Sequence, residues 1–148
     1  MNDTESLYRL IWMSRPLMQS AEAAVEKGLE GTGLTVRTRA VLEVLLTLQA
    51  ATVPDIAQKL EIKRQYVQLM VNETLAEGLT TKQENPRHKR STLIALTPKG
   101  QALIDEVVQR EMDLVRSLSK GLDPSEIETA VKVVQRVMED IKSETGRA

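Results

Sequence analysis

Residues 52–97 read TVPDIAQKLEIKRQYVQLMVNETLAEGLTTKQENPRHKRSTLIALT, and this stretch decides the fold. Its first segment is predicted to be a short helix, because Thr52 is a favourable N-cap and Asp55 follows three residues later, as in a capping box. Pro54 lies in the first turn of this helix, where its missing N–H costs nothing. The segment 61–63 that follows has room for a turn and nothing longer. The apolar face of the helix is formed by Ile56, Ala57 and Leu60.

A second helix is predicted from about Arg64 to Glu77, where Gly78 supplies the residue type that commonly follows a helix end. One side of this helix is polar and carries forked donors and acceptors that match base edges in the major groove, Arg for guanine and Gln or Asn for adenine. An ordinary solvated helix face is the alternative interpretation. The polar side is formed by Arg64, Gln65, Gln68 and Asn72, and the inward side by Val67, Met70, Val71 and Leu75.

A basic loop follows, between two predicted strands at Leu79–Gln83 and Thr92–Leu96. The loop contains Asn85-Pro86-Arg87-His88-Lys89-Arg90, and Asn-Pro initiates a turn. Three cations at one tip repel each other unless an anion lies near, and a phosphate backbone or a narrow minor groove supplies that anion. A tip that only keeps the hairpin soluble is the alternative. The order helix, turn, helix, strand, loop, strand is that of a winged helix-turn-helix.

These residues resemble the winged helix-turn-helix of the MarR (multiple antibiotic resistance regulator) family of transcription factors. The segment VPDIA at 53–57 is similar to the family's first motif helix, and residues 64–72 are similar to its recognition helix. Residues 85–91 resemble its wing, which usually reads Asp-x-Arg-x-x-Arg. The segment LTPKG at 96–100 is similar to the Leu-Thr-x-x-Gly that restarts the chain as a long helix. The resemblance rests mainly on these roughly fifty residues.

The stretch departs from the family pattern at four positions. Glu61 stands where the family often has Gly, which predicts a strained or reshaped turn. Lys63 replaces a common Ser, so the cap of the recognition helix is expected to be weak. Thr74 replaces a usual Leu, which predicts a repacked inner face. Asn85 replaces the usual Asp, which argues against a wing ion pair with the neighbouring arginines.

The composition bounds the class of protein. The chain has 148 residues, 41% hydrophobic and 28% charged, which is ordinary for one globular domain. The absence of cysteine excludes disulfides and thiolate catalysis, and a single histidine, His88, argues against a zinc site. We find no nucleophile–base constellation or phosphate loop and predict no enzyme, cofactor or metal. With no bilayer-length apolar run or signal peptide, we expect a cytoplasmic, nucleoid-associated protein of a bacterium or archaeon, without a membrane partner.

The charge of the chain is unevenly distributed. The formal net charge is −1 and the isoelectric point is about 5.9, which by themselves would argue against binding DNA. Residues 59–99, however, hold eight Lys and Arg against four Asp and Glu, a net of +4. The rest of the chain holds twelve against seventeen, a net of −5. A basic centre on an acidic frame would confine nucleic acid to one surface.

Helices are predicted on both sides of this stretch. Residues 4–27 form the first, with a bend expected at Pro16, and residues 35–49 form a second that is apolar nearly all round and therefore buried. Near its start, Arg37 and Arg39 either touch phosphate or lie at a solvated helix end. A long helix from Pro98 to about Lys120 and a last helix beginning at Pro124 complete the chain.

The terminal helices carry more apolar surface than a lone small lobe can cover, which predicts a homodimer. We therefore divide the single domain 1–148 into a helical dimerisation region, 1–34 and 98–148, and a DNA-binding lobe, 35–97. The residues predicted at the dimer interface are Leu7, Ile11, Leu114, Leu118, Ile127, Val131, Val134, Met138 and Ile141.

Tyr8, Trp12 and Arg15 share one face of the first helix, at spacing 0, 4 and 7. They are interpreted either as amphipathic packing on a helix surface or as the rim of a pocket for an apolar or aromatic acid. The resemblance implies the second, because effectors in the family often bind between this region and the DNA-binding lobe.

The sequence therefore predicts a mainly α fold, a winged helix-turn-helix with about six helices and a two-stranded wing. We predict a homodimeric, sequence-specific transcriptional regulator, a ligand-responsive repressor that reads an inverted repeat in double-stranded DNA. The alternative is a winged helix that binds an acidic protein partner. The residues predicted to contact DNA are Lys63, Arg64, Gln65, Tyr66, Gln68, Arg87, Lys89 and Arg90.

Overall fold

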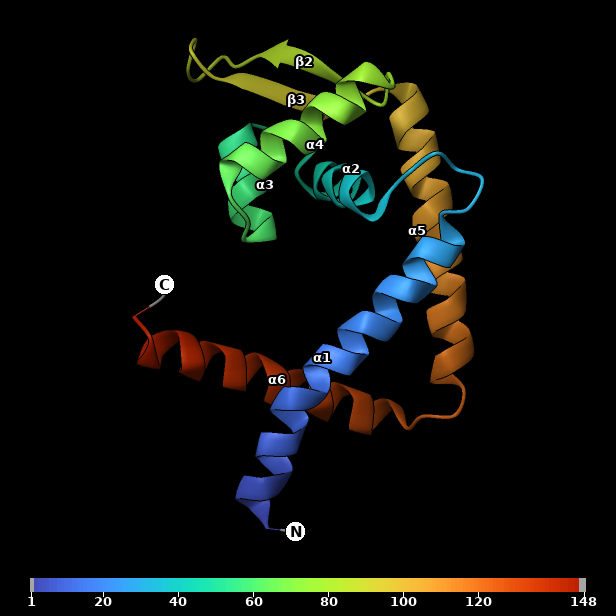
Figure 1. The fold of residues 1–148 in the computed structure, drawn as a ribbon, viewed down its shortest axis with the longest axis vertical. Helices are drawn as coiled ribbons and strands as arrows, with labels where there is room; N and C mark the ends of the chain where they lie inside the picture. The colour runs from blue at the N-terminus through green and yellow to red at the C-terminus, as the bar shows by residue number, and fades with distance from the viewer. Residues whose placement is uncertain (1, 147–148) are drawn as a thin grey trace. The chain divides into compact units, whose positions relative to one another are not determined.

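The computed structural model describes residues 2–146, which form six helices and one three-stranded antiparallel sheet (Figure 1). This confirms the predicted mainly α, winged helix-turn-helix fold. The chain divides into two compact units. One is the lobe Ala21–Glu111, and the other comprises the described residues up to Ser20 together with those from Met112 onward. In chain order the elements are α1 (Asp3–Gly28), α2 (Val36–Leu48), β1 (Ala50–Ala51), α3 (Val53–Leu60), α4 (Arg64–Ala76), β2 (Thr80–Glu84), β3 (Thr92–Leu96), α5 (Pro98–Ser119) and α6 (Pro124–Glu144).

The sheet has one strand more than the sequence predicted. Its order is β1-β3-β2, and the short β1 pairs with β3 in the register Ala50↔Ala95. The predicted two-stranded wing is present as β2 and β3. The additional strand β1 was not predicted, because two alanines carry no alternation that a pattern could show. The first wing strand also begins at Thr80 and not at Leu79, because the Leu79 N–H donates to the Thr74 carbonyl at 2.9 Å and so closes α4.

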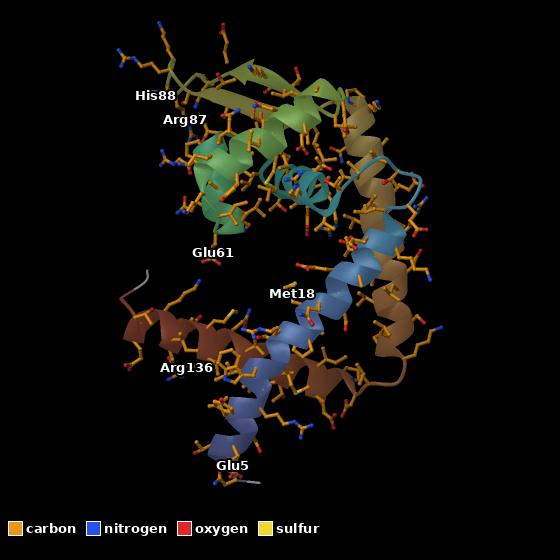
Figure 2. The ribbon with its side chains drawn as sticks, viewed as in Figure 1. Glu5, Met18, Glu61, Arg87, His88 and Arg136 are labelled. Atoms are coloured by element: carbon orange, nitrogen blue, oxygen red, sulfur yellow. The ribbon has the colours of Figure 1, made fainter. Side chains whose placement is uncertain are left out.

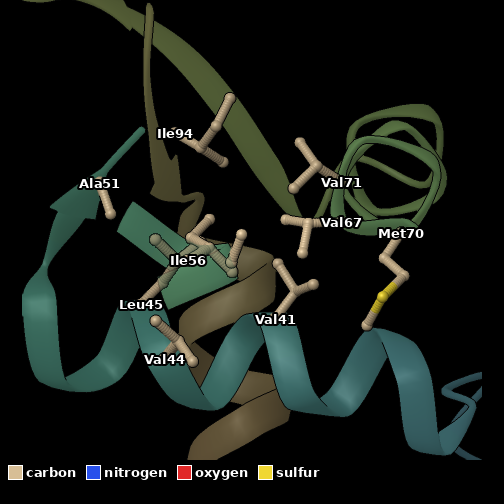
Figure 3. Close-up of a cluster of buried hydrophobic side chains, with 10 residues drawn as sticks. Val41, Val44, Leu45, Ala51, Ile56, Val67, Met70, Val71 and Ile94 are labelled. Carbon is tan, nitrogen blue, oxygen red and sulfur yellow. The ribbon is translucent and has the colours of Figure 1, made fainter. Parts of the chain in front are cut away.

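The core of the lobe lies between α2, α3, α4 and β3 (Figure 3). Ile56 and Val71, which were predicted to face inward, are buried there together with Val41 and Leu45, and Leu60 packs against the cluster from its edge. The prediction that α2 is buried all round fails at its end, where Leu48 is 40% exposed. Figure 1 shows α2, α3 and α4 on one side of the β2–β3 hairpin, so this core fixes both parts of the motif.

The start of α5 is fastened to the turn that joins α4 to β2. Thr97 donates its N–H to the Leu79 carbonyl at 3.1 Å and its Oγ1–H to the Gly78 carbonyl at 2.6 Å. A Cβ on Gly100 would lie 1.9 Å from the Leu79 carbonyl oxygen, so glycine at this position permits close approach of two backbones. The Leu-Thr-x-x-Gly segment is thus a docking element between the wing and α5.

An ion-pair cluster holds α5 against α2. The Arg39 guanidinium donates to the carboxylates of Glu111 and Glu43, and the Arg39 side chain is only 16% exposed. The hydrogen bond to Glu111 raises the pKa of Arg39 above its ordinary value, against the lowering effect of burial. Arg39 therefore neither lies at a solvated helix end nor is placed to contact phosphate, whereas Arg37 is exposed and pairs with Glu73.

The terminal helices expose their apolar residues. α1 is continuous through Pro16, and Asp123 caps α6 by accepting from the Ser125 N–H at 3.0 Å. Not one residue of α1 or α6, both of which the structure describes in full, is buried. No helix among the described residues is both long and apolar enough to cross a membrane.

Candidate nucleic-acid interface

The turn between α3 and α4 sets how the second helix leaves the first. Thr52 and Asp55 form the predicted capping box, with side-chain to backbone distances of 3.1 and 3.2 Å. Glu61 ends α3 in the left-handed region at φ 55°, which confirms the strained turn expected where glycine is usual. Lys63 occupies the N-cap of α4 without a side-chain hydrogen bond, as predicted.

α4 presents its polar face to solvent and buries the opposite one. Val67, Met70 and Val71 are buried in the core of the lobe. The Gln68 amide Nε2 donates to Asn72 Oδ1 at 2.9 Å, a contact between residues one turn apart that orients the Gln68 side chain. Sequence reasoning placed these two residues on one face but did not find their hydrogen bond. The polar residues exposed on α4 include Arg64, Gln65, Tyr66, Gln68 and Asn72.

A buried pair of hydroxyls joins the recognition helix to the wing. Thr74 is fully buried, donates to the Val71 carbonyl at 2.7 Å, and lies 2.9 Å from the Thr80 hydroxyl. This confirms the repacking expected where leucine is usual. Because a buried polar group left without a partner is costly, the Thr80 hydroxyl depends on Thr74, whose own proton goes to the Val71 carbonyl. They fix the register of β2 against α4.

The tip of the wing is built around Asn85. Its Oδ1 accepts from the Arg87 N–H at 3.0 Å, and its Nδ2 donates to Ser91 Oγ at 3.1 Å. These neutral hydrogen bonds close the turn without an ion pair, as expected where asparagine replaces aspartate. Within residues 2–146, no carboxylate pairs with Arg87, Lys89 or Arg90, all of which are exposed.

The exposed cations lie at the tip of the wing. In Figure 2, Arg87 and His88 extend from the wing tip at the upper left, and Glu61 extends downward from the end of α3. A surface with cations on a hairpin and forked amides on a helix offers phosphate contacts and base-edge contacts together. Among the described residues no group of acidic, histidine or cysteine side chains is arranged to hold a metal ion.

The aromatic cluster lies on α1, within the other unit. The Tyr8 and Trp12 rings are 6.3 Å apart, and the Arg15 guanidinium carbon lies 5.5 Å from the centre of the Trp12 ring, a cation–π distance. All three side chains are exposed. The structure therefore brings the three predicted residues together on one face.

Comparison with known proteins identifies the family. No family model matches the chain. A crystal structure of a MarR family transcription regulator is 34% identical to it, covers 99% of this chain and 97% of its own, and superposes with a TM-score of 0.90. The chain belongs to the MarR family. Its class of function is DNA-binding transcription regulation.

Two further MarR-like structures share the fold. A variant of MarR from E. coli, crystallised with operator DNA, has a TM-score of 0.78 at 20% identity and covers 93% of this chain and 99% of its own. BpsR from Bordetella bronchiseptica, whose DNA binding is regulated by 6-hydroxynicotinic acid, has a TM-score of 0.74 at 24% identity, with coverages of 88% and 98%. At these identities the likeness shows the fold alone.

Sequence reasoning missed one exposed residue on the MarR-like recognition helix. Leu69 is 58% exposed, between Gln68 and Met70, on a face otherwise occupied by polar side chains. The available signal was its spacing of four from Gln65, which places the two on the same side of the helix.

Proposed function

We propose that this MarR family member is a homodimeric repressor that reads an inverted-repeat operator and responds to a small ligand. The observation that carries the proposal is the exposed face of α4 in the same lobe as a wing whose cations pair with no carboxylate among residues 2–146. An uncompensated basic surface favours a polyanion, and the amide and guanidinium groups beside it favour one that displays base edges.

The DNA contacts divide by chemistry. Arg64, Gln65 and Gln68 reach base edges in the major groove, while Lys63 and Tyr66 lie near the sugar–phosphate backbone. The wing residues Arg87, Lys89 and Arg90 hold phosphates or enter the minor groove. The proposed DNA-binding lobe is 35–97.

The dimer is formed by the terminal helices, 1–34 and 98–148. Their apolar side chains are exposed in the single chain. On α6 the exposed fractions are 38–51% for Ile127, Val131, Val134, Met138 and Ile141. A second copy covers this surface and sets two recognition helices about 34 Å apart, in successive major grooves. The proposed interface residues are Leu7, Ile11, Leu114, Leu118, Ile127, Val131, Val134, Met138 and Ile141.

The effector is an apolar or aromatic acid that binds at Tyr8, Trp12 and Arg15. The aromatic faces supply stacking surface, and the guanidinium supplies a partner for a carboxylate. Binding shifts the population between dimers that fit the operator and dimers that do not. The proposed place of action is the cytoplasm, on the nucleoid.

The test is recovery of DNA fragments from the source genome by the purified protein, followed by affinity measurements on the enriched site. We expect an inverted repeat, and an affinity that falls steeply with salt. Gln68→Ala should weaken binding to that site by about 5- to 150-fold, corresponding to about 1–3 kcal/mol, and relax specificity at one base pair in each half-site. Binding to an acidic protein with no affinity for duplex DNA would instead support the protein-interaction alternative.

A further inference from the structure

Leu69 lies near the middle of the solvent-exposed face of α4. At about 100° per residue, Leu69 is rotated by only about 40° from Gln65, so both point away from the core. Its side chain is 58% exposed, although leucine gains free energy by burial. Contact with an apolar group of a bound duplex would bury the Leu69 side chain and gain that free energy.

Leu69 forms one wall of an open groove between α3 and α4. The groove has a volume of about 540 Å³. Val53 and Pro54, from the first turn of α3, provide further apolar surface in the same groove. The remaining lining residues, Arg64, Gln65 and Gln68, belong to the proposed base-reading set. The lining of the groove thus combines apolar side chains with polar and cationic ones.

We propose that this groove receives the C5-methyl group of a thymine in the major groove, and that Leu69 makes the operator selective for thymine at that position. Thymine is the one base that presents a methyl group there. The Arg64 charge and the forked amides that line the groove favour an anionic duplex over the apolar side chain of a protein partner. The inference rests on the proposed function, because it assigns one base of the proposed operator.

The test uses duplexes selected by the protein from a random library. In the selected site each thymine is replaced in turn by deoxyuridine, which removes the methyl group and leaves the hydrogen-bonding pattern unchanged. At one thymine in each half-site we expect about a fourfold loss of affinity, the effect of about 0.8 kcal/mol for one buried carbon group. Replacement in both half-sites together should cost about 16-fold if the two sites are independent.

The protein side of the test removes the apolar wall. The readout is the affinity for the thymine duplex divided by the affinity for the deoxyuridine duplex. This ratio should be near one for Leu69→Ala, whereas Leu69→Met, which conserves volume, should retain most of the fourfold ratio. Leu48→Ala is the matched control, because Leu48 is also exposed but does not line the groove, and it should leave the ratio at four. Because Leu69 is exposed, the circular dichroism spectrum and the unfolding midpoint of the Leu69→Ala protein should match those of the wild type.

Two results would overturn the inference while leaving the proposed function intact. One is a selected site whose affinity is unchanged by deoxyuridine at every thymine, or that contains no thymine. The other is a fourfold ratio that persists in Leu69→Ala. Failure of the wild-type protein to select any duplex would be a different result, because it would overturn the proposed function and the inference together.

Discussion

Replacing Gly100 by alanine should destabilise the lobe strongly. The added Cβ would lie 1.9 Å from the Leu79 carbonyl oxygen and 2.9 Å from its carbon, whereas ordinary contacts begin at 3.4 Å. Backbone must therefore move by roughly 1.5 Å on one side or the other, since neither contacting atom belongs to a flexible side chain. The movement pulls α5 away from the turn between α4 and β2.

The cost follows from what that movement breaks. Thr97 makes two hydrogen bonds to this turn, to the Leu79 and Gly78 carbonyls, each worth about 1 kcal/mol net. Leu79 and Ile104 are both buried, so displacement also disturbs their packing, at about 1–3 kcal/mol. The better helix propensity of alanine stabilises the folded state by about 1 kcal/mol and offsets part of this loss. The expected net loss is about 2–4 kcal/mol, or roughly 5–15 °C in the melting temperature.

The measurement is urea unfolding followed by circular dichroism, at one fixed protomer concentration because association shifts apparent stability. Gly121→Ala is the matched control, since a Cβ there meets nothing within 4 Å and its φ is not positive. It should be neutral or stabilise by up to about 1 kcal/mol. If Gly100→Ala proved as stable as Gly121→Ala, the close approach at Leu79 would not be the reason for glycine in this segment.

Three other changes test separate parts of the molecule. Arg87→Ala with Arg90→Ala should weaken binding to every duplex and flatten the plot of log affinity against log salt by about 0.9 per lost phosphate contact; an unchanged slope would exclude phosphate contact at both positions. Val134→Glu should yield monomers in sedimentation with a folded lobe, whereas Val134→Leu stays dimeric; a fully dimeric glutamate variant would show that the apolar face of α6 around Val134 is not at the interface. Glu61→Gly should raise the free energy of unfolding by about 1 kcal/mol over Glu61→Ala, because it relieves a left-handed residue, and equal stabilities would contradict that strain.

The elements that the sequence predicted well are those whose signals are local. The capping box of Thr52 and Asp55 spans three residues, and the start of α6 depends on Asp123 and Pro124, so adjacent side chains determine both helix ends. β1 lacked such a signal, because its strand character comes from pairing Ala50 with Ala95, a partner distant in the sequence. A sequence pattern indicates periodicity within a segment, but it does not indicate which distant segment will supply the hydrogen bonds.

The same limit applies to individual side chains of the site. Arg39 was considered for phosphate contact, but its charge is taken up by Glu111, which lies 72 residues further along the chain. The hydroxyl partner of Thr74 is Thr80, on the next element, and Leu69 of α4 shares a groove with Val53 and Pro54 of α3. In each case the sequence shows the residue type, but tertiary structure determines which residue it contacts.

Asn85, which stands where the family usually has aspartate, affects the charge of the wing tip. An aspartate could also accept from the Arg87 N–H, but it could not donate to Ser91 Oγ as Asn85 Nδ2 does, and it would bring a negative charge to the tip. Asparagine therefore shapes the turn while leaving the three wing cations uncompensated. Because the chain as a whole has a formal charge of −1, its attraction to a polyanion depends on local charge, and a neutral residue at this position preserves it. Asparagine in place of aspartate therefore favours the proposed contact between the wing cations and DNA.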